Sequence, residues 1–205
     1  YYSPTHSGMK AFIMTKVGDV MMLAGMFLIF AFAGTFGFRE LTANTSWATA
    51  MSAQHLLIPA AVLLFGGAIG KSAQFPLNEW LLEAMTGPTA VSALIHAATM
   101  VKAGVFLVAR LAPLFFALAA IGINMDQFFE IIAWVGAITA LLLATQGMVH
   151  PEIKKVLAYS TGSQIGYMMM ALGVAGLSKQ FVDGYTAGFF HLISHAMFKA
   201  SLFMA

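Results

Sequence analysis

The sequence predicts an all-α polytopic membrane protein with six transmembrane helices, and three observations carry this prediction. Of the 205 residues, 60% are hydrophobic and only 9% are charged, whereas soluble domains carry about 25% charged residues. Six stretches are apolar over the roughly 20 residues that a spanning helix needs. No run alternates polar and apolar residues as a half-buried strand does. The six stretches cover residues 11–33, 55–83, 89–111, 127–149, 152–176 and 184–205.

Composition and charge exclude several other classes of protein. The net charge of +2 is too small for the basic footprint of a nucleic-acid-binding protein. The absence of cysteine excludes disulfides, iron–sulfur ligation and thiol catalysis. The chain begins without a basic n-region or an initiator methionine and stops inside an apolar run, so we expect it to be a piece of a longer protein.

The first stretch contains a pair of opposite charges. Lys16 and Asp19 are three residues apart and therefore lie on one face of a helix. We expect them to pair and to enter the membrane as a nearly neutral unit.

The second stretch holds a lysine and then a helix breaker. Lys71 follows a long apolar run and Gly70, and Pro76 comes five residues later. A charge at the bilayer centre costs at least about 2.5–3.5 kcal/mol. Proline frees backbone acceptors, which are tolerated at that depth only beside protein or a water-filled cavity. The sequence predicts a helix broken between Gly70 and Pro76 with an ion site at Lys71; the alternative is a snorkelling lysine and a harmless kink.

The third stretch carries a small and polar stripe. At 100° per residue, one helical face holds Ser92, His96, Thr99 and Ala103. His96 is either a working group or a packing residue. Lys102 lies about 120° away from this stripe, where it is a second buried titratable group or pairs with another helix.

A short link, VHPE, joins the fourth stretch to the fifth. Pro151 suits a first helical turn, where its missing N–H costs nothing. Glu152 and Lys154 stand at the start of the fifth stretch, either as interface charges or as a gate. A polar band deeper in that helix consists of Ser160, Thr161, Ser163 and Gln164.

The sixth stretch gives the strongest pattern. An arc of about 80° on a straight helix contains Gly184, Gly188, His191, His195 and Lys199. The three titratable groups form a ladder with steps of roughly 6 Å, and the glycines leave room beside them. Histidine changes charge near neutral pH, so the row predicts a proton relay bridged by water. The alternative is a helix-packing face.

Two further chemistries fit the histidines less well. Histidines four residues apart, without a nearby carboxylate or cysteine, make a poor zinc site, so we predict no metal. His96 together with His191 or His195 could ligate a haem between two helices, which keeps a membrane cytochrome as an alternative.

Long motifs of the chain resemble a known family. The segment GKSAQFPLNEWLLEAMTGPTAVSALIHAATMVKAG resembles the core motif of the large antiporter-like (L-type) membrane subunits of respiratory complex I. Their archaeal relatives belong to dehydrogenases that oxidise a reduced deazaflavin, and both are similar to subunits of Mrp-type sodium/proton antiporters. The resemblance extends over MKAFIMTKVGDVMMLAG, HPEIKKVLAYSTGSQIGYMMMALG and FHLISHAMFKASLFMA.

The resemblance implies a fold of two inverted five-helix bundles, each with one broken helix. Residues 1–111 then form the last three helices of the first bundle, and residues 112–205 form the first three of the second. It also implies roles for the charged residues. The proton-transfer groups are Lys71, His96, His191, His195 and Lys199. The supporting charged groups are Lys16, Asp19, Lys102, Glu152 and Lys154, and the helix breaks at Gly70 and Pro76.

Some features lie outside the chain or depart from the family pattern. The family's glutamate partner for Lys71 lies upstream of the first residue. Leu82 and Glu83 stand where Pro and Asp are expected, and Ala90 stands where Pro is expected. Lys102 replaces the threonine of many bacterial members and favours the archaeal relatives.

The function implied is that of a proton-translocating membrane subunit of a complex I-like oxidoreductase, with no redox centre and no cofactor in this chain. Its partners are then other membrane subunits, the lipid bilayer and protons, with sodium as the alternative ion, and no nucleic acid. We expect the cell membrane of a prokaryote rather than the mitochondrial inner membrane. The alternatives are an Mrp-type sodium/proton antiporter subunit and a haem-binding membrane cytochrome.

Overall fold

The computed structural model describes residues 4–97, 99–178 and 180–204, and the last residue of the predicted sixth stretch lies outside these ranges. Within them the chain is helical and contains no strand. The helices are α1 (Pro4–Ala33), α2 (Phe38–Ala43), α3 (Ser46–Ala53), α4 (Leu57–Lys71), α5 (Trp80–Glu83), η1 (Ala84–Thr86), α6 (Thr89–Ala97), α7 (Met100–Ala117), η2 (Leu118–Ile121), α8 (Asp126–Val149), α9 (Ile153–Leu177) and α10 (Phe181–Met204).

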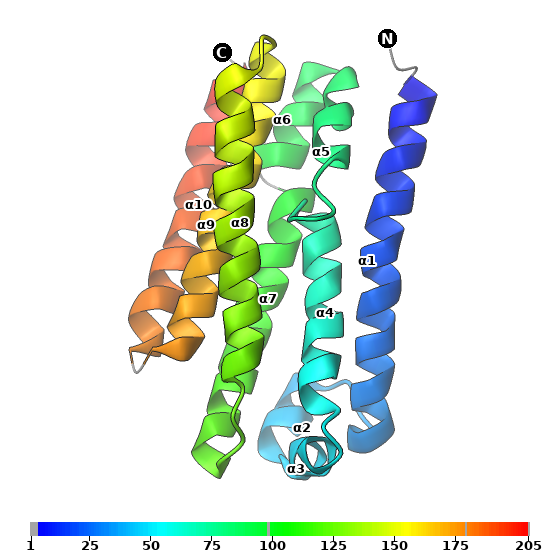
Figure 1. Ribbon diagram of the computed structural model, residues 1–205, viewed down its shortest axis with the longest axis vertical. Helices are drawn as coiled ribbons and strands as arrows, with labels where there is room; N and C mark the ends of the chain where they lie inside the picture. The colour runs from blue at the N-terminus through cyan, green and yellow to red at the C-terminus, as the bar shows by residue number, and fades with distance from the viewer. Residues whose placement is uncertain (1–3, 98, 179, 205) are drawn as a thin grey trace.

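The long helices run side by side (Figure 1). The helix α1 packs on α4, which contacts α7, and α7 in turn contacts α9. The helices α8 and α9 form a tight hairpin, and α10 packs on α9 and α6. The start of α1 and the end of α10 lie at the same end of the molecule. This order places the second, third and sixth predicted stretches, which hold the five predicted proton-transfer groups, in one connected set of helices.

Several helices are long and apolar enough to cross a membrane. By length and composition these are Thr5–Ala33, Thr89–Ile121 and Asp126–Val149, and the pair α3 and α4, bent by 107°, makes a fourth if it counts as one span. The chain is therefore a multi-pass membrane protein. The count of six spans and the inverted bundles stay predictions.

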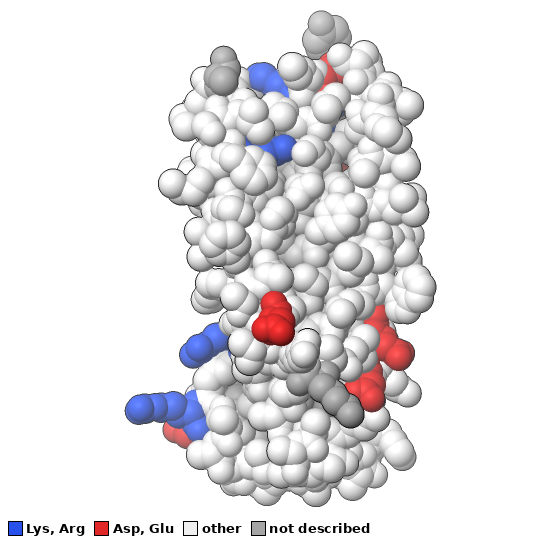
Figure 2. All heavy atoms as spheres, turned by 90° about the vertical axis from the view of Figure 1, so that its left-hand side faces the viewer, with Lys and Arg blue, Asp and Glu red and all other residues white. Residues whose placement is uncertain are grey.

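The outer surface is apolar over much of its height. Trp134 and Leu141 on α8 are 67% and 68% exposed, and Met197 on α10 is 74% exposed. Figure 2 shows this side with its Lys, Arg, Asp and Glu side chains near the upper end and in the lower third, and a broad band of other residues between them. Such a band suits lipid tails or another membrane protein.

The third predicted stretch is not one continuous helix. It divides into α6 and α7, and α7 continues to Ala117. Thr99 closes α6, because its N–H and its hydroxyl both donate to the carbonyl of Leu94. Ser92 and His96 are buried, but Thr99 and Ala103 are exposed, so the four residues of the predicted stripe do not share one buried face. The connection after the first stretch also differs from a plain loop, because it contains α2 and α3.

Candidate functional site

The helix break predicted in the second stretch is present. The helix α4 ends at Lys71, and the chain resumes helical structure only at Trp80, beyond Pro76. A polar side chain satisfies one freed backbone group there, because the indole N–H of Trp80 donates to the carbonyl of Gly70 at 3.1 Å. The hydroxyl of Ser72, just after the end of α4, donates to the carbonyl of Val101 on α7 at 2.7 Å. The break is thus held by protein contacts, as irregular backbone at membrane depth requires.

Lys71 meets a carboxylate from the first helix. Its Nζ lies 3.2 Å from Oδ2 of Asp19, and the Nζ of Lys16 lies 3.0 Å from the same oxygen. The pairing of Lys16 with Asp19 agrees with the prediction from their spacing. Asp19 therefore connects two lysines, one of them on the broken helix.

Glycines allow this close approach of α1 and α4. A Cβ atom added at Gly18 would lie 2.7 Å from the carbonyl oxygen of Gly66 and 3.0 Å from the Cα of Gly70. Any larger residue would push the two helices apart. Gly70 thus serves the break in a second way, because it brings α1 and the carboxylate of Asp19 next to Lys71.

His96 on α6 is fully buried, with 0% exposure. Its ring stacks on Phe203 of α10 with a centroid distance of 5.3 Å. Neither ring nitrogen has a hydrogen-bond partner among the described residues, and the hydroxyl of the buried Ser92 lacks one as well. Buried polar atoms usually have a hydrogen-bond partner, so the role of His96 as a working group stays a prediction that these two nitrogens make worth testing.

Lys102 on α7 is also buried, with 4% exposure. Its Nζ donates to the backbone carbonyl of Leu192 on α10 at 2.7 Å. Lys102 thus contacts a neighbouring helix at Leu192, the residue after His191.

The titratable ladder on α10 has the spacing that the sequence predicts. The rings of His191 and His195 are 6.1 Å apart between centroids. His195 and Lys199 are buried, at 0% and 1% exposure, and neither ring nitrogen of His195 has a partner among the described residues. The Nε2 of His191 lies 2.7 Å from the Oε1 of Gln164 on α9, a residue of the polar band in the fifth stretch.

The glycines beside this ladder do not leave open room. A Cβ at Gly184 would lie 2.8 Å from the Cβ of Ala175, and one at Gly188 would lie 3.3 Å from the carbonyl oxygen of Met168. The helix α9 occupies the space that we expected for water. The glycines instead let α9 approach α10, which brings Gln164 to His191.

The charges at the start of α9 include one ion pair. Glu152 pairs with Lys155, three residues on, at 3.1 Å, and whether Glu152 and Lys154 act as interface charges or as a gate stays a prediction. Lys154 lies with both of them on a cavity of about 600 Å³ that Glu83 and His150 also line. The cavity places these groups at the end of the molecule where α1 begins.

One cluster was missed by reasoning from sequence. Lys10 near the start of α1 lies 2.9 Å from a carboxylate oxygen of Glu79 and 2.6 Å from one of Glu83. The four-residue spacing of Glu79 and Glu83 was the only signal, because their partner is far away along the chain. Glu83, a departure from the family pattern, thus has a structural role.

The chain is similar to membrane subunits of known enzymes. It is 46% identical over 208 residues to NADH-quinone oxidoreductase subunit L of Escherichia coli, covering 100% of this chain and 31% of that protein. It is 48% identical over 198 residues to NAD(P)H-quinone oxidoreductase chain 5 of Picosynechococcus, covering 95% of this chain and 27% of that protein. The chain thus spans about a third or less of the length of these relatives.

Two solved structures share its fold. The Mrp complex of Dietzia matches with a TM-score of 0.83 and 32% identity, over 98% of this chain and 20% of the matched one. The archaeal membrane-bound sulfane sulfur reductase, a respiratory membrane complex, matches with a TM-score of 0.81 and 29% identity, over 99% of this chain and 33% of the matched one.

A family description also covers almost the whole sequence. Residues 2–205 match the family described as NADH:quinone oxidoreductase/Mrp antiporter, TM. With the broken helix, the buried lysines and histidines and the relatives above, the chain belongs to the NADH:quinone oxidoreductase/Mrp antiporter transmembrane family.

Proposed function

We propose that this chain is part of a proton-translocating membrane subunit of a complex I-like respiratory oxidoreductase and performs no redox chemistry itself. The contact between Lys71 and Asp19 carries this proposal. A lysine at the end of a broken helix, held by a carboxylate at 3.2 Å, can gain or lose its partner when the helix moves. Because a charge at membrane depth is costly without a partner, each change of partner favours the release or uptake of a proton.

The onward route runs through the remaining buried groups. His96, His195 and Lys199 are buried on facing helices. Neither ring nitrogen of His96 or His195 has a partner among the described residues, and buried polar groups usually have one. The route therefore requires water molecules at these rings themselves, because α9 fills the space beside the glycines of α10. A proton leaving Lys71 then moves through His96 to the ladder on α10, with Lys102 and His191 beside it.

The wider setting is part of the same proposal. Residues 1–111 and 112–205 belong to two inverted bundles, with six spans in all, and the subunit sits with other membrane subunits in the cell membrane of a prokaryote. The place among other membrane subunits is supported by the relatives, which are named as subunits of NADH-quinone oxidoreductase. It is also supported by the two solved structures that this chain matches, an Mrp complex and an archaeal respiratory membrane complex.

The test is Lys71→Ala in the complete subunit, within its native complex reconstituted into vesicles that hold a pH-sensitive dye. We expect the complex to assemble, electron transfer to continue at a reduced rate, and acidification to fall to a small fraction of normal. Lys155→Gln, which alters an ion pair outside the proposed route, is the matched control. Near-normal acidification by the Lys71 variant refutes the proposal.

A second candidate is sodium/proton antiport, favoured by the structural match to the Mrp complex at a TM-score of 0.83. The same vesicles distinguish the two. Transport that follows an imposed sodium gradient supports antiport, whereas acidification that is unchanged without sodium supports proton pumping. A Soret band that is stoichiometric with the subunit and lost on His96→Ala refutes both in favour of a cytochrome.

A further inference from the structure

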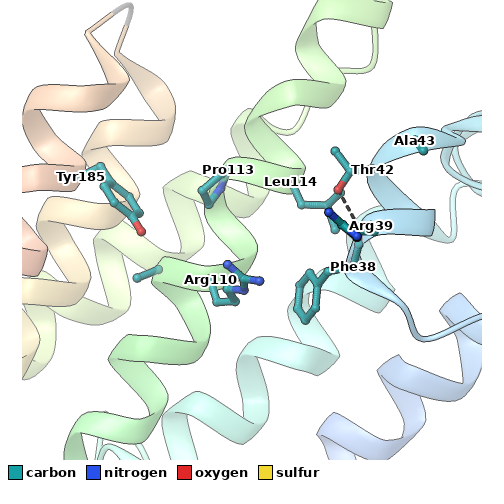
Figure 3. Close-up of a pocket in the computed structure, with 9 residues that line it drawn as sticks. Phe38, Arg39, Thr42, Ala43, Arg110, Pro113, Leu114 and Tyr185 are labelled. Carbon is teal, nitrogen blue, oxygen red and sulfur yellow. Dashed lines mark hydrogen bonds between the residues drawn. The ribbon is translucent and has the colours of Figure 1, made fainter.

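A groove of about 520 Å³ lies where α2, α7 and α10 meet. It is at the opposite end of the molecule from the start of α1 (Figures 1 and 3). Arg39 and Thr42 of α2, Arg110 and Pro113 of α7 and Tyr185 of α10 line it. We call it the arginine groove. None of these residues belongs to the proposed proton route.

The two guanidinium groups have no carboxylate partner in the described part of the chain. Neither arginine forms an ion pair there, and both are exposed. The neighbouring carboxylate of Glu40 accepts a hydrogen bond from the hydroxyl of Thr35 instead. Arg110 is held in place by the ring of Phe38, with its Cζ 5.0 Å from the ring centroid. Two positive charges thus share one groove with no negative charge to balance them.

The chemistry of the groove identifies the kind of ligand. A guanidinium presents planar pairs of N–H donors that match the oxygens of a phosphate. The groove also carries the side chains of Thr42 and Tyr185, and Figure 3 shows the tyrosine oxygen directed toward Arg110. The remaining wall at Pro113 and Leu114 is apolar. An anion that carries apolar groups fits such a lining better than a free ion does.

The position of the groove identifies the source of that ligand. Tyr185 lies one turn after the start of α10 at Phe181, close to where α9 ends, and tyrosines at the ends of spans sit at the depth of lipid headgroups. Phe106, one turn before Arg110 on α7, is 55% exposed and continues an apolar surface from the groove toward the middle of the membrane. We propose that the arginine groove binds the phosphate of an anionic membrane phospholipid, whose acyl chains lie along α7.

The test uses the complete subunit in its native complex. Native mass spectrometry after mild detergent extraction counts the phospholipids bound to the wild type, to Arg39→Gln/Arg110→Gln and to the control Lys155→Gln, a cation at the other end of the molecule. We expect the double variant to lose one anionic phospholipid that the control retains. Its retention should fall about tenfold or more, since each charged hydrogen bond contributes enough for that factor. Arg39→Lys/Arg110→Lys, which keeps the charge without the fork, should retain part of it.

Three further measurements separate the sources of the ligand. A photoactivatable phosphatidylglycerol in the vesicles should label α2 or α7 in the wild type and not in the glutamine double variant. Equal lipid retention by all variants overturns the proposal. The proposal is also overturned if a crosslinker attached at the groove captures an Asp or Glu from elsewhere in the complex, because the arginines then pair with that carboxylate. Protection of the groove by inorganic phosphate alone, with no acyl-bearing species bound, also overturns the lipid as its source. Because the readout is bound lipid, a failure of proton pumping leaves this result interpretable.

Discussion

Asp19 balances the charge of the broken helix at the scale of a single residue. One of its carboxylate oxygens contacts the ammonium groups of both Lys16 and Lys71. The Lys71 side chain is 34% exposed and the Lys16 side chain 52% exposed, so neither pair is fully buried and the contribution of each to stability is small. We therefore expect Asp19 to matter as the partner of Lys71 more than for holding the fold.

The first prediction concerns this carboxylate. Asp19→Asn removes the carboxylate that pairs with Lys71, while the side chain keeps its shape. We expect normal assembly, a loss of stability of no more than about 1 kcal/mol, and several-fold slower proton pumping per assembled complex. Asp19→Glu, which keeps the charge, should recover much of the rate. Wild-type pumping in the asparagine variant means that Lys71 does not depend on Asp19.

The second prediction concerns Gln164. Its side chain meets the Nε2 of His191 at 2.7 Å and so orients the ring. Gln164→Leu has a similar volume but no polar atom, so we expect slower pumping with unchanged assembly. Gln164→Glu keeps an acceptor and should retain more activity. If both variants pump at the rate of the wild type, Gln164 only packs against α10.

At the scale of elements, glycines set the distances between helices. Gly136 of α8 and Gly166 of α9 face each other, and a Cβ at Gly166 would lie 2.7 Å from the carbonyl oxygen of Gly136 and from the backbone N of Ala140. Backbone atoms cannot rotate away as a side chain can. Close packing of this kind is common between membrane helices, where small residues let backbones approach.

The third prediction follows from this contact. Gly166→Ala gains up to about 1 kcal/mol in helix propensity but forces the α8–α9 hairpin apart, which costs about 1–3 kcal/mol. We expect a net loss, seen as a lower midpoint in thermal denaturation followed by size-exclusion chromatography. Gly8→Ala on α1 has no atom within 4 Å of the added Cβ and should keep or raise the midpoint. Equal midpoints in the two variants contradict the assigned role of Gly166.

The elements differ in how well the sequence predicts them. The break at Lys71 was predictable, because a glycine directly before the lysine and a proline shortly after it are local signals for the end of a helix. Neither signal depends on a contact with a distant part of the chain. The division between α6 and α7 was not, because it depends on Thr99 turning its hydroxyl to the carbonyl of Leu94 within an otherwise apolar run. The ladder on α10 was predictable in its spacing from the helical period. The helix that fills the space beside its glycines was not.

Contacts between distant residues are beyond the reach of sequence patterns for a related reason. The pairing of Lys16 with Asp19 spans three residues, so helix geometry predicts it. Lys71 lies 52 residues from Asp19 and Lys102 lies 90 residues from Leu192. A single sequence shows that such buried charges need partners but does not identify them.

At the scale of the whole molecule, the titratable groups follow the order in which the helices pack. Lys71 ends α4, His96 and Lys102 lie on α6 and α7, and the ladder lies on α10. The contacts of Ser72 with Val101 and of Lys102 with Leu192 tie these helices together. We therefore expect a shift of α4 at its break to move α7 and, through the contact of Lys102 with Leu192, to move α10. These contacts offer a physical basis for coupling the charge on Lys71 to the groups on α10.

The last prediction tests whether the ladder conducts as a unit. If His191, His195 and Lys199 act in series, losing one histidine should slow pumping without stopping it. A gap of one step, about 6 Å along the helix, is short enough for water to bridge. Losing both leaves roughly 12 Å along α10 between position 191 and Lys199. His191→Ala/His195→Ala should therefore lose more pumping than the two single losses predict, as expected for residues that share one network.

The control is Phe190→Ala/Met197→Ala, at two positions of the same helix that are 69% and 74% exposed. It controls for the loss of side-chain volume and should pump normally once assembled. Vesicle acidification divided by the amount of assembled complex gives the comparison. Full normalised pumping in the double histidine variant removes these residues from the proton route, and poor assembly with intact normalised pumping assigns them to helix packing.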